Sequence, residues 1–390
     1  MRVAIVAEYY PRAADPVLGV WAHRQALAAR DAGVDVRVLV LHRPVPPKAA
    51  LARRDPAELL APLRQPLRAE LDGIEVRYVP FLAPPRPRTY ASWGAWAAPP
   101  LALALRRLRR EFRYDLVHAH YAAPAGDAVR RARPGTPYVV SVHGGDVLSV
   151  VRRPGGERAV RRALDSARLV LANSAAIERR ARALGASAAR VVHLGTDLPA
   201  ERADRDGHPG ALVTVAHLVG RKRHADVLRA LWLLRDSHPA LAWTVVGDGP
   251  ERPALERLAG ELGLSGRLWF TGRLPPAEAV AAARSGSVFV MPSVDEAFGV
   301  AYVEAMAGSV PAIGCRGEPG PEEIAAVGGG IRLVAPGDPE ALAAELGSLL
   351  DEPGWRREVG RQARATVEAA FTWPRCGAAT VAAYEEALRT

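Results

Sequence analysis

The chain has 390 residues, of which 49% are hydrophobic and 24% charged, a balance typical of a globular protein with room for two ordinary domains. Its two cysteines, Cys315 and Cys376, imply no disulfide framework, so a reducing cytosol is the natural compartment. The segment Met1–Glu8 becomes acidic too early for a signal peptide, and no apolar run approaches the roughly 18 residues of a membrane span. A cytoplasmic protein, soluble or peripheral at the inner face of the membrane, is therefore expected.

The formal net charge of +10 is divided unevenly along the chain. Residues 1–200 carry 32 Lys and Arg against 17 Asp and Glu, a balance of +15, whereas residues 201–390 carry 20 against 25, a balance of −5. Three explanations of the basic half stay open: an anionic membrane surface, an acidic acceptor, or Arg-rich usage in a chain also rich in Ala, Gly and Pro. Nucleic acid is not expected, because no basic stripe with interleaved aromatic residues occurs.

Apolar runs alternate with amphipathic stretches in the first half of the chain. Helices are expected at Trp21–Ala32 and Leu101–Phe112. The segment His42–Ala98, dense in Pro and Arg around one short strand, is interpreted as loops and short helices. Strands alternating with helices predict a parallel sheet. The expected strands are Val3–Ala7, Val34–Leu41, Ile74–Val79, Leu116–Ala119, Tyr138–Val142 and Leu169–Ala172.

The pattern restarts after the polar stretch Glu201–Gly210. Two doubly wound α/β domains are predicted, 1–203 and 204–373, followed by a helical stretch at Cys376–Leu388. Ligands of such sheets bind beyond the carboxyl ends of the strands, so the active site is expected in the cleft between the domains. The strands expected in the second domain are Leu212–Ala216, Ala242–Val246, Leu268–Phe270, Val288–Met291, Pro311–Ile313 and Ile331–Val334.

Polar segments follow two strands of the first domain, and they contain His118, His120 and His143. Three histidines near strand ends suggest zinc, but no adjacent carboxylate completes a ligand set at metal spacing. The pair Asp204 and Asp206 lies in the polar stretch rather than after a strand, and it is interpreted as solvated. No metal dependence is expected.

Lys222 is distinguished by its rarity, since Lys48 and Lys222 are the two lysines among 52 basic residues. It lies just after the expected strand Leu212–Ala216, where a loop at the carboxyl edge of the sheet is predicted. A compact ammonium there suits a bound diphosphate, with Arg221 or Arg223 as a planar fork to it. The alternative is a solvated basic turn.

Two segments of the second domain combine a strand end with a helix start. Val245–Arg252 is not the dinucleotide fingerprint, because Arg252 occupies the last glycine position. The more informative segment is Pro292–Gly308, in which a turn follows a buried strand and a helix opens near Gly299. Glu296 precedes that helix and Glu304 lies inside it. Because a helix N-terminus suits a phosphate, the two carboxylates are placed to hold hydroxyl groups on either side of a diphosphate, as a nucleotide sugar requires. Two solvated glutamates on a surface helix are the alternative.

This segment resembles the signature of the retaining GT-B glycosyltransferases of glycosyltransferase family four (glycosyl transferases group 1), in which two such glutamates flank the donor site. The resemblance extends from Met1 to about Tyr384. It implies the GT-B fold, with two Rossmann-like domains facing across a cleft, the first binding the acceptor and the second the donor, and with residues 374–390 packing back on the first. It also implies metal-independent transfer of a hexose-type sugar from a UDP- or GDP-sugar to a hydroxyl of a small-molecule or lipid acceptor. The nucleotide sugar is then a co-substrate, and no cofactor is implied.

The resemblance also assigns roles around the diphosphate. Lys222 matches the phosphate-binding lysine of the family. The family's preceding arginine corresponds to His217, so either His217 or Arg221 must replace it. Gly19 matches a glycine whose backbone N–H lies close to the diphosphate, where a side chain would clash. His143 matches a histidine that helps to orient the donor sugar and the acceptor.

On the same resemblance Glu304 holds the ribose hydroxyls and Glu296 the sugar hydroxyls. Backbone around Arg273 and Leu274, beside Gly247, contacts the nucleobase. The start of the helix at Phe298, Gly299 and Val300 completes the donor site.

The residues expected to act in catalysis are His143, Lys222 and Glu296. No general base is obvious, which suits a same-face displacement in which the leaving phosphate takes the acceptor proton. Two alternatives stay open: another GT-B enzyme, such as a sugar phosphorylase or nucleotide-sugar epimerase, or a non-catalytic module that binds sugar nucleotides or membrane surfaces. The Ala, Arg, Gly and Pro bias is typical of a GC-rich bacterial genome.

Overall fold

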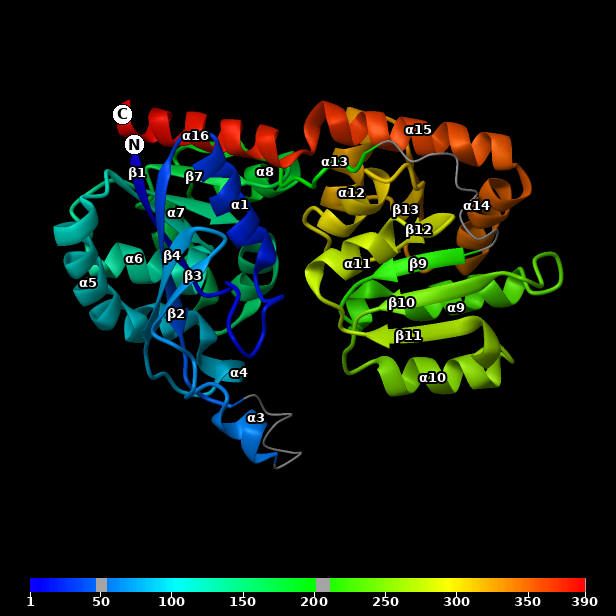
Figure 1. Cartoon of the computed structure of the whole chain (residues 1–390), viewed down its shortest axis with the longest axis horizontal. Helices are drawn as coiled ribbons and strands as arrows, with labels where there is room; N and C mark the ends of the chain where they lie inside the picture. Colours follow the sequence, from blue (N-terminus) through cyan, green and yellow to red (C-terminus); the bar gives the residue numbers. More distant parts are fainter. Residues whose placement is uncertain (47–54, 201–210, 390) are drawn as a thin grey trace. The chain divides into compact units, whose positions relative to one another are not determined.

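The chain forms two α/β units, each built on one sheet with helices around it (Figure 1). The structure, a computed structural model, describes residues 1–46, 55–200 and 211–389. Unit 1 comprises Met1–His193 and Trp373–Thr390, and unit 2 comprises Leu194–Thr372. The polar stretch at residues 201–210, where the sequence predicts the domain junction, lies outside the described residues, as do Asp204 and Asp206.

The sheet of unit 1 has eight strands in the order β3-β4-β2-β1-β5-β6-β7-β8. All neighbours are parallel except β3, which pairs antiparallel with β4. Strands β5, β6 and β7 are buried along their whole length, as expected of a parallel sheet covered on both faces. The strands are β1 (Arg2–Ala7), β2 (Asp35–His42), β3 (Arg68–Leu71), β4 (Ile74–Pro80), β5 (Leu116–His120), β6 (Tyr138–Val142), β7 (Leu169–Ala172) and β8 (Ala189–Val191).

The last helix of the chain, α16, lies beside α1 in unit 1 (Figure 1). A Cβ at Gly377 would lie 2.2 Å from the carbonyl oxygen of Ala28, so glycine allows the two helices to approach closely. Gln25 Nε2 donates to Thr380 Oγ1 at 3.1 Å across the same contact. The helices of this unit are α1 (Val20–Asp31), α3 (Pro56–Leu60), α4 (Arg86–Thr89), α5 (Trp93–Phe112), α6 (Asp127–Ala132), α7 (Gly156–Asp165), α8 (Ala175–Ala183) and α16 (Trp373–Arg389).

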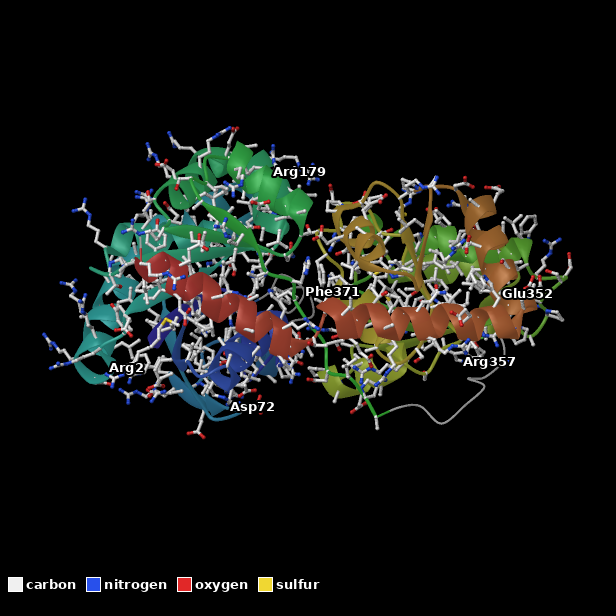
Figure 2. The ribbon with its side chains drawn as sticks, turned by 90° about the horizontal axis from the view of Figure 1, so that it is seen from above. Arg2, Asp72, Arg179, Glu352, Arg357 and Phe371 are labelled. Atoms are coloured by element: carbon white, nitrogen blue, oxygen red, sulfur yellow. The ribbon has the colours of Figure 1, made fainter. Side chains whose placement is uncertain are left out.

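Two expectations for the segment 42–98 are wrong. It contains two strands, not one, because β3 and β4 form a hairpin through Asp72 and Gly73, both with positive φ (Figure 2 labels Asp72). An Asp-Gly pair between two strands is a strong hairpin signal. In addition, α5 begins at Trp93 rather than Leu101 and contains Pro99 and Pro100. The helix continues through both prolines because its buried residues form one apolar stripe, and this packing outweighs the local cost of proline.

The sheet of unit 2 has six parallel strands in the order β11-β10-β9-β12-β13-β14, and all six lie where the sequence predicts them. The central strand β9 has β10 on one side and β12 on the other, so the strand order reverses between β9 and β12. This is the doubly wound arrangement that was predicted. The strands are β9 (Ala211–Val215), β10 (Ala242–Val246), β11 (Leu268–Gly272), β12 (Val288–Val290), β13 (Ala312–Cys315) and β14 (Ile331–Val334).

Helices α9, α10 and α14 bury apolar side chains against this sheet around Trp243, which is fully buried. The last helix of unit 2 is α15, and Phe371, labelled in Figure 2, follows it. The carbonyl oxygen of Phe371 accepts the backbone N–H of Thr196 at 2.9 Å. The helices are α9 (His224–Leu233), α10 (Arg252–Glu261), α11 (Pro276–Ala283), α12 (Val300–Met306), α13 (Pro319–Val327), α14 (Pro339–Asp351) and α15 (Pro353–Ala370).

Gly19→Ala is expected to destabilise unit 1 strongly. Gly19 has a φ of 67°, and a Cβ there would lie 2.2 Å from the carbonyl carbon of Tyr9. Gly155 offers a matched control, because it also precedes a helix, has a φ of 71° and has nothing within 4 Å of its Cβ position. Gly155→Ala should therefore cost about 1–2 kcal/mol for the left-handed backbone.

Gly19→Ala should cost about 1–3 kcal/mol more, because it adds a clash with backbone that cannot shift freely. Denaturant unfolding of both variants measures the difference. Equal losses of unfolding free energy would contradict the close approach at Gly19.

Candidate functional site

The loops after β9 and β12 meet at the point where the strand order of unit 2 reverses. The loop after β9 leads into a 3-10 turn at Gly220–Lys222, and the turn after β12 leads into α12. Loops on either side of such a reversal run in opposite directions and leave a crevice at the carboxyl edge of the sheet. Lys222 and Glu296 lie in these loops, as predicted, and the fold brings their side chains together.

Lys222 and Glu296 form a buried ion pair. Lys222 Nζ lies 2.5 Å from Glu296 Oε2, and each residue is 8% exposed. Arg221 Nη1 lies 3.5 Å from the same oxygen, and Ser293 Oγ donates to it at 2.9 Å. The cationic loop and the carboxylate were each predicted as donor-binding groups, but their direct pairing was not.

The carboxyl of Glu296 is held in its charged form. Burial alone would raise the pKa of Glu296, but Lys222 and Arg221 outweigh it and hold that pKa below its ordinary value. Burial lowers the pKa of Lys222, and the carboxylate of Glu296 opposes this. A buried ion pair contributes little to stability relative to an apolar pair of similar size. A buried pair of perturbed titratable groups at the carboxyl edge of the sheet is therefore a candidate functional site.

The turn that carries Glu296 is fixed by buried hydrogen bonds. The hydroxyl of Tyr302 donates to the carbonyl oxygen of Met291 and lies 3.3 Å from Ser293 Oγ. Gly299, with a φ of 83°, precedes α12, which confirms the predicted helix start. Glu304 lies in α12 with its side chain partly exposed.

The other predicted donor-binding residues of unit 2 occupy neighbouring strand ends. Gly247 follows β10, and its N–H donates to the carbonyl oxygen of Gly272 at 2.8 Å. A Cβ at Gly247 would lie 2.0 Å from the carbonyl oxygen of Ala216, so this position requires glycine. Arg273 and Leu274 follow β11, exposed and partly exposed respectively.

Two predicted positions differ in what their side chains can reach. Phe298 is 1% exposed, and its ring lies 5.5 Å from the ring of Phe371, so its side chain packs in the interior of unit 2. His217 is exposed on the loop after β9. Of the two candidates for the missing arginine, Arg221 is the one that lies at Glu296.

In unit 1, His143 follows β6 and belongs to a row of three histidines. His143 Nε2 lies 3.0 Å from His120 Nδ1, and the two rings are nearly parallel at 12°. His118 stacks on His120 with ring centroids 4.3 Å apart and is held by Tyr384 Oη at 2.6 Å. Asp146 Oδ1 accepts the backbone N–H of His143 at 3.1 Å.

Burial makes this row electrically neutral. It lowers the pKa of His118 and His143 to about 3 each, and that of His120 well below its ordinary value. Burial also raises the pKa of Asp146 to about 6, although backbone N–H groups oppose the shift. A neutral imidazole at His143 suits the expected role in orienting hydroxyl groups rather than storing a proton.

Sequence analysis did not identify Ser293, Tyr302 or Glu318. Glu318 follows β13, so the rule that ligands gather at strand carboxyl ends would have pointed to it. Within 1–46, 55–200 and 211–389, no group of three or more His, Cys, Asp or Glu side chains is arranged to hold a metal ion. Over the same residues, no helix combines the length and the apolar character needed to cross a bilayer.

Two family descriptions match successive parts of the chain: "Glycosyltransferase Family 4" at residues 18–199 and "Glycosyl transferases group 1" at residues 201–366. The structure of Anabaena HepE in complex with UDP-glucose superposes with a TM-score of 0.73 at 18% identity, covering 99% of each chain. This structural similarity and the strand order of each sheet show that the two units have the GT-B fold.

Similarity to curated relatives supports the same family. A putative teichuronic acid biosynthesis glycosyltransferase, TuaC of Bacillus subtilis, is 28% identical over 95% of each chain. A GDP-mannose-dependent phosphatidylinositol monomannoside mannosyltransferase of Mycolicibacterium smegmatis is 32% identical over 65% of this chain and 72% of that protein. The chain belongs to the group 1 glycosyltransferases of glycosyltransferase family 4.

Proposed function

We propose that this glycosyltransferase moves a hexose-type sugar, with retention of configuration and without a metal, from a UDP- or GDP-sugar to a hydroxyl of a small-molecule or lipid acceptor. The single observation that carries the proposal is the buried ion pair of Lys222 and Glu296, with the exposed Arg221 beside it, at the strand-order reversal of unit 2. It joins two cations suited to a diphosphate with one carboxylate suited to sugar hydroxyls.

The printed names of similar proteins support both candidate bases of the donor. HepE is described with UDP-glucose, and the mycobacterial relative is described as GDP-mannose-dependent. The named relatives are bacterial, which supports a bacterial enzyme.

In the proposed reaction, the bond between the sugar and the diphosphate breaks and negative charge develops on the departing phosphate. Lys222 and Arg221 stabilise that charge, as preorganised cations do in a site shielded from water. The ammonium of Lys222 then has two partners, the phosphate and Glu296, while the carboxylate of Glu296 accepts hydrogen bonds from the sugar hydroxyls. The acceptor hydroxyl oxygen bonds to the anomeric carbon on the face from which the phosphate leaves, and the phosphate takes the proton of that hydroxyl, so no protein base is required.

A donor screen by thermal shift tests the proposal. A ligand at about 100 times its Kd adds about 2.7 kcal/mol to the free energy of unfolding, a shift that is readily measured. We expect stabilisation by UDP or GDP and by one of their sugars, followed by acceptor-dependent release of the nucleoside diphosphate. Donor binding without turnover across a broad acceptor panel would reject transfer, and release of a sugar phosphate on addition of inorganic phosphate would favour a phosphorylase.

The basic surface of unit 1 predicts binding to anionic membranes if the acceptor is a lipid. Each exposed basic side chain near an anionic bilayer contributes about 1 kcal/mol. Sedimentation with anionic liposomes should show binding at low salt that weakens at moderate salt, and absence of binding at low salt would leave a soluble acceptor. The basic residues are Arg106, Arg107, Arg109 and Arg110 on α5, with Arg152, Arg153, Arg161 and Arg162 after β6.

A further inference from the structure

Glu318 lies three residues beyond the end of β13 and immediately before α13, but its side chain does not cap that helix. The backbone N–H of Glu296 donates to Glu318 Oε2 at 2.9 Å, and the backbone N–H of Asp295 also bonds to the carboxylate. One carboxylate therefore satisfies two successive N–H groups of the turn that carries Glu296. A charged acceptor makes each of these bonds stronger than a neutral one would.

The first turn of α13, directly after Glu318, holds the carbonyl group of Glu296. The N–H of Gly320 donates to the carbonyl oxygen of Glu296 at 2.8 Å. A Cβ at Gly320 would lie 2.0 Å from the carbonyl oxygen of Phe298, so only glycine allows the backbone at Gly320 to pack this closely on the turn that carries Glu296. Both backbone polar groups of Glu296 are thus bonded to the loop after β13.

Partly burying the Glu318 carboxyl beside a strained turn costs free energy, which indicates a role beyond local stability. Burial raises the pKa of Glu318, and the nearby carboxylates of Asp295 and Glu296 raise it further, while the two backbone N–H groups oppose these shifts. Asp295 has a φ of 52°, in the left-handed region that side chains other than Gly adopt infrequently. A strained turn at a binding site needs surrounding structure to hold it.

We propose that Glu318 is a positioning residue, which fixes the backbone of Glu296 so that its carboxylate stays at Lys222 and is presented to the donor sugar. The part that concerns the sugar rests on the proposed function. Glu318 itself is assigned no contact with the substrate.

Hydrogen exchange tests the backbone part without any substrate. In Glu318→Gln and Glu318→Ala, peptides spanning residues 293–299 should exchange faster than in the parent protein, with Ala the larger effect because Gln keeps one oxygen acceptor. Glu322→Gln is the matched control, since Glu322 is exposed on α13 and its Oε1 accepts the N–H of Gly317 at 2.8 Å. Unchanged exchange in both Glu318 variants would overturn the inference.

Kinetics with the donor found by the thermal-shift screen tests the functional part. A misplacement of about 1 Å costs up to about a hundredfold in rate, so kcat should fall about tenfold in Glu318→Gln and about a hundredfold in Glu318→Ala. The Kd and the stoichiometry of UDP or GDP binding should stay within about twofold, because the nucleoside diphosphate does not depend on Glu296.

The outcomes separate the inference from the proposed function. A loss of kcat matched by an equal loss of nucleotide-binding stoichiometry would mean partial unfolding and would overturn the positioning role, as would unchanged kcat. If the parent protein transfers no sugar while residues 293–299 lose protection in the variants, the proposed function fails and the backbone role of Glu318 stands.

Discussion

Lys222→Ala is expected to lower kcat/KM for sugar transfer by about a hundredfold or more, the scale of losing one preorganised group that stabilises developing charge. The structure adds a second consequence, because Glu296 is buried and has Lys222 as its nearest cation at 2.5 Å. Without Lys222, the pKa of Glu296 should rise, since burial raises it and one of the two opposing cations is gone.

Steady-state kinetics with saturating acceptor measures the first effect, and the acid limb of the pH–rate profile measures the second. That limb should move to higher pH in Lys222→Ala, because the carboxylate of Glu296 then takes up its proton at higher pH. Arg229→Ala is a suitable control, since Arg229 is exposed on α9 and pairs with Asp226, which keeps Arg223 as a partner. Near-normal turnover in folded Lys222→Ala would remove Lys222 from the reaction.

Glu304→Ala is expected to weaken nucleotide binding, whereas Glu296→Ala is expected to lower the rate of sugar transfer. If Glu304 holds the ribose, its loss removes hydrogen bonds to a charged group worth about 1.5–3 kcal/mol, so the Kd of free UDP or GDP should rise about tenfold to a hundredfold. If Glu296 holds the sugar, its removal should leave that Kd within about threefold, because Lys222 and Arg221 remain.

Calorimetry with free nucleoside diphosphate, together with kcat for the intact donor, measures both effects. Glu296→Ala should lower kcat by about a hundredfold, the scale of an interaction that orients the reacting sugar. The reverse pattern, with Glu296→Ala weakening nucleotide binding and Glu304→Ala sparing it, would invert the orientation of the donor on unit 2.

The sequence predicts the six strands of unit 2 because each is a short apolar run between polar segments. It does not predict β3, whose four residues Arg68–Leu71 are partly or fully exposed at an edge of the sheet and so carry no burial pattern. The sequence places the start of α5 too late. Proline disfavours a helix locally, whereas the buried apolar stripe from Trp93 to Leu108 stabilises this helix over several turns.

In the candidate site too, local features are predicted from the sequence, whereas contacts between distant segments are not. Lys222, Glu296 and the start of α12 at Val300 are predicted because each lies in the segment between a strand and the next helix or at the start of that helix. The ion pair between Lys222 and Glu296 is not, because 74 positions of sequence separate the two side chains and only the pairing of β9 with β12 brings them together. Glu318 is missed for the same reason, as its partners Asp295 and Glu296 belong to another loop.

The position of α16 has a consequence for how the protein is made. Unit 1 lacks this helix until the ribosome has synthesised all of unit 2, because α16 spans Trp373–Arg389. Until then the face of α1 that receives Gly377 and Thr380 is uncovered, and His118 lacks the hydroxyl of Tyr384. Unit 2 can fold as soon as it emerges, whereas unit 1 matures last, through contacts between the two ends of the chain.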